Sequence, residues 1–241
     1  MAGSQYIALS GMRTRLDQLD RLAADIANVN TAGYKSERSA DAQSDRPQFS
    51  RVLQSAIDVT NGTHRIDVSP GMLASTGRDL DAAVEGNGFF VIDTPAGPRY
   101  TRNGHFSRSS DGTLVADDGA AVEGTSGPIT LGKGEVKIDV DGTIRSGGAP
   151  VGKLKVVAFD DPTVLSAESG ARLRAPESVE PKDVDKPLVR GGTLEQSNVS
   201  VVDRVAQLTS VTRSFEALQK AMSLVMNDID GRAIDQLGRL R

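Results

Sequence analysis

The chain has 241 residues, enough for one large domain or two modest ones, and its formal net charge at pH 7 is −4. The acidic balance, without any cluster of Lys and Arg, argues against a nucleic-acid partner. Cysteine is absent, which excludes disulfides and thiolate metal sites. No apolar run reaches the roughly 18 residues that a membrane span needs, so we expect no membrane insertion. Polar residues interrupt the N-terminal segment, which argues against a cleaved signal peptide.

The N-terminal segment, residues 3 to about 28, has the period of one amphipathic helix. Its apolar side chains recur at steps of three and four, at Leu9, Met12, Leu16, Leu19, Ala23 and Ile26. This is the a/d pattern of a coiled-coil-like helix, which needs a partner surface to be buried. The alternative is an ordinary amphipathic helix packed on its own domain. Asn28, Asn30 and Gly33 follow, and these residues favour the left-handed conformations that end helices.

The middle of the chain lacks the helical period of the N-terminal segment. Residues 34–75 lose the helical period, which predicts a connector with short β-like stretches at 51–57 and 64–68. Beyond it, short β-rich runs alternate with turn residues at 80–85, 89–93, 99–102, 113–115, 135–140 and 154–159. Pairs such as Asp111-Gly112 and Asp141-Gly142 accept the positive φ of tight hairpins. This spacing predicts an antiparallel barrel or sandwich, followed by loops over residues 160–192.

A second apolar stripe lies near the C-terminus, at Leu208, Val211, Phe215, Leu218, Met222, Val225 and Ile229. Its helix is expected to begin at Ser200, an N-cap with Asp203 in a weak capping box, and to run to about Asp230. Gly231 offers a stop or bend before a short helical tail. The two stripes predict an α+β fold in which N- and C-terminal coiled-coil-like helices pair with each other beside a central antiparallel β-rich domain. Two terminal helices that each need an apolar partner surface favour a subunit of a polymer.

The candidate chemical motifs are weak. Gly86-Asn87-Gly88 precedes an apolar strand rather than a helix, so it is a turn and not a dinucleotide loop. The run that ends in Asp139-Val140-Asp141-Gly142-Thr143 is similar to the nucleophile motif of haloacid-dehalogenase phosphatases. That fold needs parallel strands alternating with helices, so a β-hairpin is the better interpretation. His64 and His105 lack the spacing of metal ligands. We therefore expect no catalytic residues, no metal and no cofactor.

Several stretches together resemble the bacterial flagellar rod and hook proteins. The helix-end segment contains the signature residues Asn28, Asn30, Thr31, Gly33, Tyr34 and Lys35. The central domain contributes Leu80-Asp81, Gly86-Asn87-Gly88-Phe89-Phe90 and Tyr100-Thr101-Arg102-Asn103-Gly104-His105-Phe106. The C-terminal part contributes Leu194-Glu195-Gln196-Ser197-Asn198-Val199 and Arg213-Ser214-Phe215-Glu216. The chain departs from the family at Ala24-Asp25, where paired Asn residues are frequent.

The resemblance implies a structural subunit of the flagellar basal body, and the short polar connector resembles that of proximal-rod members. Such proteins polymerise into a hollow shaft that crosses the periplasm, transmits torque and encloses the export channel. The implied partners are other copies of the chain, other proximal and distal rod proteins, and the flagellar type III export apparatus, which exports the chain without a cleaved signal. The implied division is residues 1–33 and 193–241 for the helices of an inner axial domain, 34–75 for the connector, and 76–192 for the β-domain.

Other functions remain as alternatives. A distal rod or hook subunit of the same family is the nearest one. A secreted adhesin would not need matched apolar stripes at its two ends. The phosphatase interpretation would require magnesium-dependent activity that is lost on Asp139→Asn.

Overall fold

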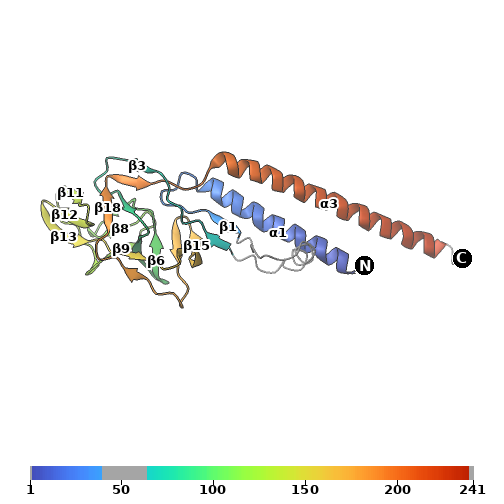
Figure 1. Cartoon of the computed structure of the whole chain (residues 1–241), viewed down its shortest axis with the longest axis horizontal. Helices are drawn as coiled ribbons and strands as arrows, with labels where there is room; N and C mark the ends of the chain where they lie inside the picture. Colours follow the sequence, from blue (N-terminus) through green and yellow to red (C-terminus); the bar gives the residue numbers. More distant parts are fainter. Residues whose placement is uncertain (1, 40–63, 239–241) are drawn as a thin grey trace. The chain divides into compact units, whose positions relative to one another are not determined.

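The computed structural model describes residues 2–39 and 64–238, and only the backbone of residues 2–8, 10, 39, 64 and 225–238 (Figure 1). The chain divides into two compact units. The helical unit contains helix α1 (Ala2–Ala27) as far as Ile26, and helix α3 (Val201–Gly238). The β unit contains residues 27–39 and 64–199. No helix of the described residues is both long and apolar enough to span a membrane.

Helix α3 begins as the sequence predicts. The Ser200 hydroxyl accepts a hydrogen bond from the Asp203 N–H at 3.4 Å, and the Ser200 carbonyl accepts one from the Arg204 N–H at 3.0 Å. The first is the N-cap interaction, which satisfies an otherwise unpaired helix donor, and the second is the first backbone hydrogen bond of the helix itself. The helix does not stop at Gly231 but continues to Gly238, because one glycine costs a helix interior only about 1 kcal/mol.

The expected pairing of the two helices as a coiled coil is wrong. Leu9 and Leu16 of the predicted N-terminal stripe are 59% and 47% exposed, whereas the buried positions among the described side chains of α1 are Leu22 and Asp25. Successive helical residues are rotated by about 100°, so a face centred on Leu22 is turned away from one centred on Ala23. Asp25 instead forms an ion pair with Arg204 at 2.9 Å. With 26 residues, α1 is also too short to cover the 38 residues of α3.

The α+β character and the short antiparallel strands are as predicted. The β unit contains β1 (Glu37–Ser39), β2 (His64–Ile66), β3 (Leu73–Ser75), β4 (Ala82–Glu85), β5 (Phe89–Thr94), β6 (Gly97–Thr101), β7 (Ser107–Arg108), β8 (Leu114–Val115), β9 (Ala121–Gly124), β10 (Gly127–Pro128), β11 (Val136–Ile138), β12 (Thr143–Ser146), β13 (Ala149–Lys153), β14 (Val156–Ala158), β15 (Ser166–Ser169), β16 (Arg172–Arg174), β17 (Lys182–Asp183), β18 (Leu188–Gly191) and β19 (Thr193–Glu195). A 3-10 turn, η1 (Pro162–Val164), follows β14.

The largest sheet has the order β15-β16-β6-β5-β9-β8-β7, with β10 beside β9 and with β14 between β5 and β17. Smaller sheets pair β11-β12-β13, β18-β4, β19-β3 and β1-β2. Every pairing is antiparallel, including the hairpin of β11 and β12 across Asp141-Gly142. Residues 160–192 were expected to be loops, yet they contain β15 to β18. Of these strands, β15 and β17 are edges of the largest sheet and β18 pairs with β4 alone, so the burial that gives a strand its alternating pattern is incomplete there.

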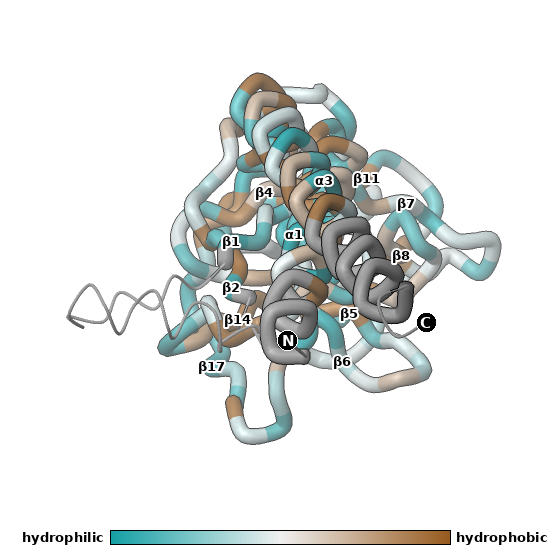
Figure 2. Tube along the Cα trace, turned by 90° about the vertical axis from the view of Figure 1, so that its right-hand side faces the viewer, coloured by the Kyte–Doolittle hydropathy of each residue, from teal (hydrophilic) through white to brown (hydrophobic). Residues whose placement is uncertain are grey.

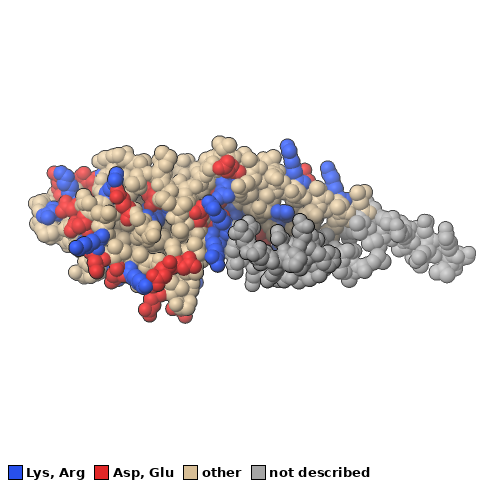
Figure 3. Space-filling view, in the orientation of Figure 1, with Lys and Arg blue, Asp and Glu red and all other residues tan. Residues whose placement is uncertain are grey.

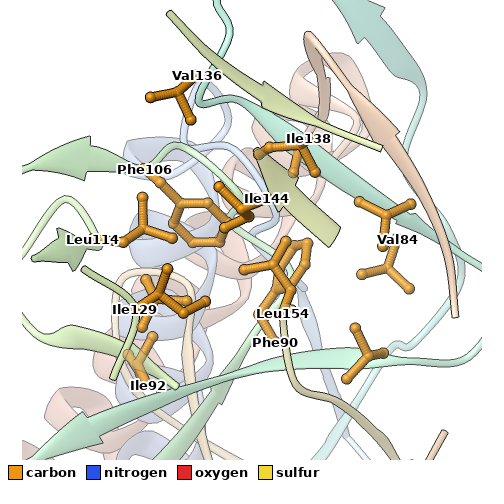
Figure 4. Packing of buried hydrophobic residues seen from close by; sticks show 14 of the residues in the cluster. Val84, Phe90, Ile92, Phe106, Leu114, Ile129, Val136, Ile138, Ile144 and Leu154 are labelled. Atoms are coloured by element: carbon orange, nitrogen blue, oxygen red, sulfur yellow. The ribbon is translucent and has the colours of Figure 1, made fainter. Parts of the chain in front are cut away.

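Strand β5 separates two hydrophobic cores because its side chains alternate between its faces. Phe90 and Ile92 join the larger cluster, in which Phe90 meets Phe106 edge-on at a centroid distance of 5.1 Å (Figure 4). Phe89 and Val91 join the smaller cluster on the other face. The continuous apolar run 89–92 is thus fully buried on both sides.

Candidate functional site

The segment that follows α1 turns sharply beside the β-sheets. Thr31 donates from its N–H to the Asn28 carbonyl at 3.0 Å and from its hydroxyl to the Asn28 side chain at 3.2 Å. Gly33 then adopts φ +67°, and a Cβ there would lie 2.2 Å from backbone atoms of Arg102 and Asn103. Only glycine permits both the conformation and the close approach.

Beyond Gly33 the chain lies extended between two other segments of the β unit. On one side the Gly33 N–H donates to the Glu195 carbonyl at 2.7 Å, and the Asn198 N–H donates to the Tyr34 carbonyl at 3.4 Å. On the other side the Asp67 N–H donates to the Ser36 carbonyl at 2.8 Å. The residues just after α1 are therefore held by those just before α3 and by the segment around β2.

A buried group of three charged side chains lies at this place, and we call Lys35, Arg102 and Glu195 the charged junction. Lys35 Nζ donates to Glu195 Oε1 at 2.5 Å and to the Ser69 carbonyl at 2.8 Å. Arg102 Nη1 donates to Glu195 Oε2 at 3.3 Å. The Gly71 N–H adds a third donor to Glu195, at 2.9 Å. All three charged residues are buried, so each depends on the others for its solvation.

Arg102 also fixes the loop between β4 and β5. Its guanidinium donates to the Val84 carbonyl at 3.1 Å and to the Gly86 carbonyl at 2.5 Å, and it lies 4.9 Å above the Phe89 ring. Burial lowers the pKa of Arg102, and Glu195 opposes that shift. The cation–π contact and the carbonyls replace part of the water that burial removes.

The pKa of Lys35 is also lowered, because burial disfavours its charged form more strongly than Glu195 favours it. The burial of Lys35 therefore carries a desolvation cost that the attraction of Glu195 does not fully offset. Such a pair can select one register of the chain, since any displacement of Lys35 would leave a buried charge unpaired.

Asn198 extends this network towards β2. Its side chain accepts from the Ser36 N–H at 2.9 Å and donates to the Asp67 carbonyl at 2.8 Å. Asp67 in turn accepts from the Ser69 N–H at 3.0 Å. Burial raises the pKa of Asp67, but the hydrogen bonds from Ser69 and Arg38 outweigh it and hold that pKa below its usual value. The amide of Asn198 is thus matched by partners on both sides.

The structure places the signature residues unequally. Gly33, Tyr34 and Lys35 are buried within the β unit, while Asn30 is exposed and Asn28 and Thr31 are half-buried. The N-terminal stripe is also mixed: Leu9, Leu16 and Ala23 are exposed, whereas Met12, Leu19 and Ile26 are half-buried.

The C-terminal stripe is the less exposed face of α3. Val211 is buried, and half-buried positions are Leu208, Phe215, Leu218 and Met222. The side chains of Val225 and Ile229 lie outside the described residues. Hydrophobic and hydrophilic residues alternate along the described turns of α3 (Figure 2). Whether either stripe is an assembly surface stays a prediction.

The alternative chemical interpretations gain no support from the described residues. Asp139 pairs with Arg145 at 2.7 Å, and Asp141 accepts from the Thr143 N–H at 3.0 Å within the predicted hairpin. No group of His, Cys, Asp or Glu in the described residues has the arrangement of a metal site. Acidic and basic side chains are interspersed over the visible face of the β unit (Figure 3).

Comparison with known families gives three matches along the chain. Residues 6–35 match the flagella basal body rod protein family, residues 83–146 the flagellar hook protein FlgE/F/G D1 domain, and residues 190–235 the C-terminal family of flagellar basal body rod FlgEFG proteins. The charged junction contains one residue from each of the three matched regions. The matches thus cover the two helices and the centre of the β unit.

Full-length relatives agree. The chain is similar to the flagellar basal-body rod protein FlgF of Mesorhizobium japonicum, with 33% identity over 99% of each chain. It is 30% identical to the FlgF of Caulobacter vibrioides over 100% of each chain. It is 31% identical to the rod protein FlgG of Bacillus subtilis over 92% of this chain and 95% of that one. The chain therefore belongs to the flagellar basal-body rod protein family, and its function is that of a structural protein of the basal-body rod.

The resemblance seen in the sequence, which is closest to the FlgF type, is confirmed by these relatives. The sequence did not reveal the charged junction or the roles of Asn198 and Asp25. Glu195 and Arg102 stand within motifs that carry the resemblance, yet nothing local in a single sequence pairs either of them with Lys35. The division of the chain into four segments drawn from the sequence remains a prediction.

Proposed function

We propose that this protein is a subunit of the proximal part of the flagellar rod, where it assembles with copies of itself and with other rod proteins. In this role it helps to build a hollow shaft that crosses the periplasm, encloses the export channel and transmits torque. The observation that carries the proposal is the full-length similarity to FlgF-type rod proteins. The relatives are structural proteins, so the proposal assigns this chain neither an enzymatic activity nor a cofactor.

The charged junction supports a mechanical role. It ties the residue segment after α1, the loops near β3 and β6, and the segment before α3 to one another. Buried hydrogen bonds and ion pairs of this kind resist displacement, because any movement that breaks them leaves buried charged groups unpaired. A force applied to the segment after α1 or to the segment before α3 is therefore transmitted to the sheets through a short and rigid set of contacts.

The apolar stripe of α3 is the surface that we assign to contacts with neighbouring subunits. Leu208 and Leu218 lie on this stripe and are only half-buried, and the exposed residues Val202 and Val205 add apolar surface to the same helix. Apolar side chains gain most when a neighbour removes them from water. We extend the same proposal to export through the flagellar type III apparatus, as the family resemblance implies.

The test uses two neighbouring positions of α3 that differ in exposure. Cells that lack their own copy should produce the wild type, Leu218→Asp or Ala217→Asp, and the chain should be quantified in purified basal bodies. Leu218 is half-buried and Ala217 is exposed, so we expect Leu218→Asp to be lost from the rod and Ala217→Asp to be retained. Absence of the wild type from basal bodies would overturn the proposed function. Normal incorporation of Leu218→Asp would overturn only the assignment of the stripe.

A further inference from the structure

Strand β3 is an edge strand of the β unit. It pairs antiparallel with β19, with Ser75 opposite Thr193 and Leu73 opposite Glu195. Among the described residues the sheet ends there, since β3 and β19 form a two-stranded sheet. The other edge of β3 therefore has no strand beside it in the part of the chain that the structure describes.

The hydrogen-bond register shows which backbone groups are free to pair. The Gln196 N–H donates to the Met72 carbonyl and the Thr76 N–H to the Gly192 carbonyl, both at 2.8 Å. In an antiparallel ladder, bonded positions alternate with positions whose N–H and C=O face the other way. Leu73 and Ser75 are the alternate positions, so their backbone donors and acceptors point away from β19.

This edge also lacks the usual protection against pairing. Residues 71–76, Gly-Met-Leu-Ala-Ser-Thr, contain no charge and no proline. Met72 is 76% exposed and Leu73 is 41% exposed. Natural edge strands are commonly guarded by Lys, Pro, bulges or a covering segment, because an open apolar edge receives other strands. An unguarded edge of this kind fits an extended polypeptide.

The edge is rigidly held on its inner side. Gly71 donates to Glu195 at 2.9 Å, and a Cβ at Gly71 would lie 1.8 Å from the Gln196 carbonyl oxygen. Strand β3 is thus fixed to the segment that leads to α3, and it is anchored to the charged junction. A strand added here would need little reordering of its receptor, which favours pairing.

We propose that the outer edge of β3 receives an extended strand from a second copy of this chain, which lengthens the β3-β19 sheet across the subunit boundary. The inference rests on the proposed function, because a polymer places copies of the chain side by side. A continuing polymer uses two different surfaces for each contact. The added strand therefore comes from another edge of the neighbour and not from its own β3.

The first test removes one outward donor. Ser75→Pro deletes the Ser75 N–H, which does not bond β19, whereas Ser75→Ala removes the hydroxyl and keeps the N–H. We expect the amount of Ser75→Pro in basal bodies to fall about three- to tenfold, as for the loss of one or two hydrogen bonds at an interface. Ser75→Ala should match the wild type. Ala74→Pro removes a bonded position facing β19 and serves as the reference for damage to the fold.

A second variant covers the case in which proline disturbs β3 itself. Met72→Lys places a charge on an already exposed side chain, so its unfolding midpoint should equal that of the wild type while its incorporation falls. A photo-crosslinking residue at position 72 of the assembled wild type should give an adduct of two copies of this chain. Normal incorporation of both Ser75→Pro and Met72→Lys, or an adduct only with another protein, would overturn the inference. The proposed function would survive either result, since it depends on the incorporation of the wild type.

Discussion

Lys35 and Glu195 are 160 residues apart in the sequence, and their side chains meet at 2.5 Å in the interior of the β unit. Lys35 belongs to the segment that follows α1, and Glu195 to the segment that leads to α3. One buried contact therefore joins the place where the chain enters the β unit to the place where it leaves. The stability of the β unit should depend on both segments and not on its sheets alone.

Loss of one partner of this pair should be costly. Glu195→Gln would leave Lys35 and Arg102 as buried cations without a counter-charge. We expect the free energy of unfolding to fall by about 3–5 kcal/mol, the range for breaking a buried ion pair from one side. Urea denaturation followed by circular dichroism and tyrosine fluorescence measures the change.

The matched control is Glu85→Gln, because Glu85 also pairs with a basic residue, Arg190, but at the surface. Exposed pairs contribute about 0–1 kcal/mol, so the control should be close to the wild type. Equal losses in the two variants would contradict the role that we give to burial.

A double variant separates charge pairing from other effects of substitution. Lys35→Met removes the cation, and Glu195→Gln removes the negative charge but keeps one acceptor oxygen near Gly71 and Arg102. Because the double variant leaves neither Lys35 nor Glu195 charged, it should lose less stability than the sum of the two single variants. We expect a coupling free energy of about 1–3 kcal/mol from a double-mutant cycle. Strictly additive losses would mean that the two side chains act independently.

The turn at Gly33 provides a third prediction. Gly33→Ala combines an unfavourable positive φ with a Cβ placed 2.2 Å from backbone atoms of Arg102 and Asn103. Gly170 has a similar φ of +55°, but a Cβ there meets nothing within 4 Å. Gly170→Ala should therefore cost about 1 kcal/mol, the penalty of the conformation alone, while Gly33→Ala should cost several times more. Thermal unfolding of the two variants gives the comparison, and equal shifts would count against the close packing of this turn.

The sequence predicts the parts of the fold that depend on local patterns. The apolar run 89–92 gives strand β5, and Asp141-Gly142 gives the hairpin of β11 and β12, because strand propensity and turn chemistry act over a few residues. The N-cap at Ser200 is found in the same way. The family resemblance also depends on short motifs, which can be recognised in a single sequence.

The sequence does not predict what depends on partners. An apolar stripe shows that a helix needs a contact, but it does not show which face of the helix is buried. In α1 the buried residues Leu22 and Asp25 lie beside the predicted stripe and not on it. The charged junction was missed for a related reason. Lys35, Arg102 and Glu195 have no periodic relation, and only the fold brings them together.

The fourth prediction concerns acid stability and the Asp-Gly-Thr turns. Hydrogen bonds from Ser109 and Thr113 lower the pKa of Asp111 below its usual 3.8, and the backbone and hydroxyl of Thr143 do the same for Asp141. A carboxylate whose pKa is lowered by folding stabilises the protein above pH 3.8, and this contribution is lost as the pH falls through the folded-state pKa.

The double variant Asp111→Asn/Asp141→Asn keeps an acceptor oxygen in each turn but removes the titrating groups. Its free energy of unfolding should therefore fall less steeply than that of the wild type as the pH drops from about 4 to about 2. Thr113→Val with Thr143→Val removes only the hydroxyl donors and should give an intermediate slope, because the backbone N–H of residue 143 still favours the ionised form of Asp141. Parallel curves of unfolding free energy against pH for the three proteins would show that the protonation of Asp111 and Asp141 does not change stability. The loss of stability in acid would then come from other carboxylates, and Asp67, beside the charged junction, would be the first of these to substitute.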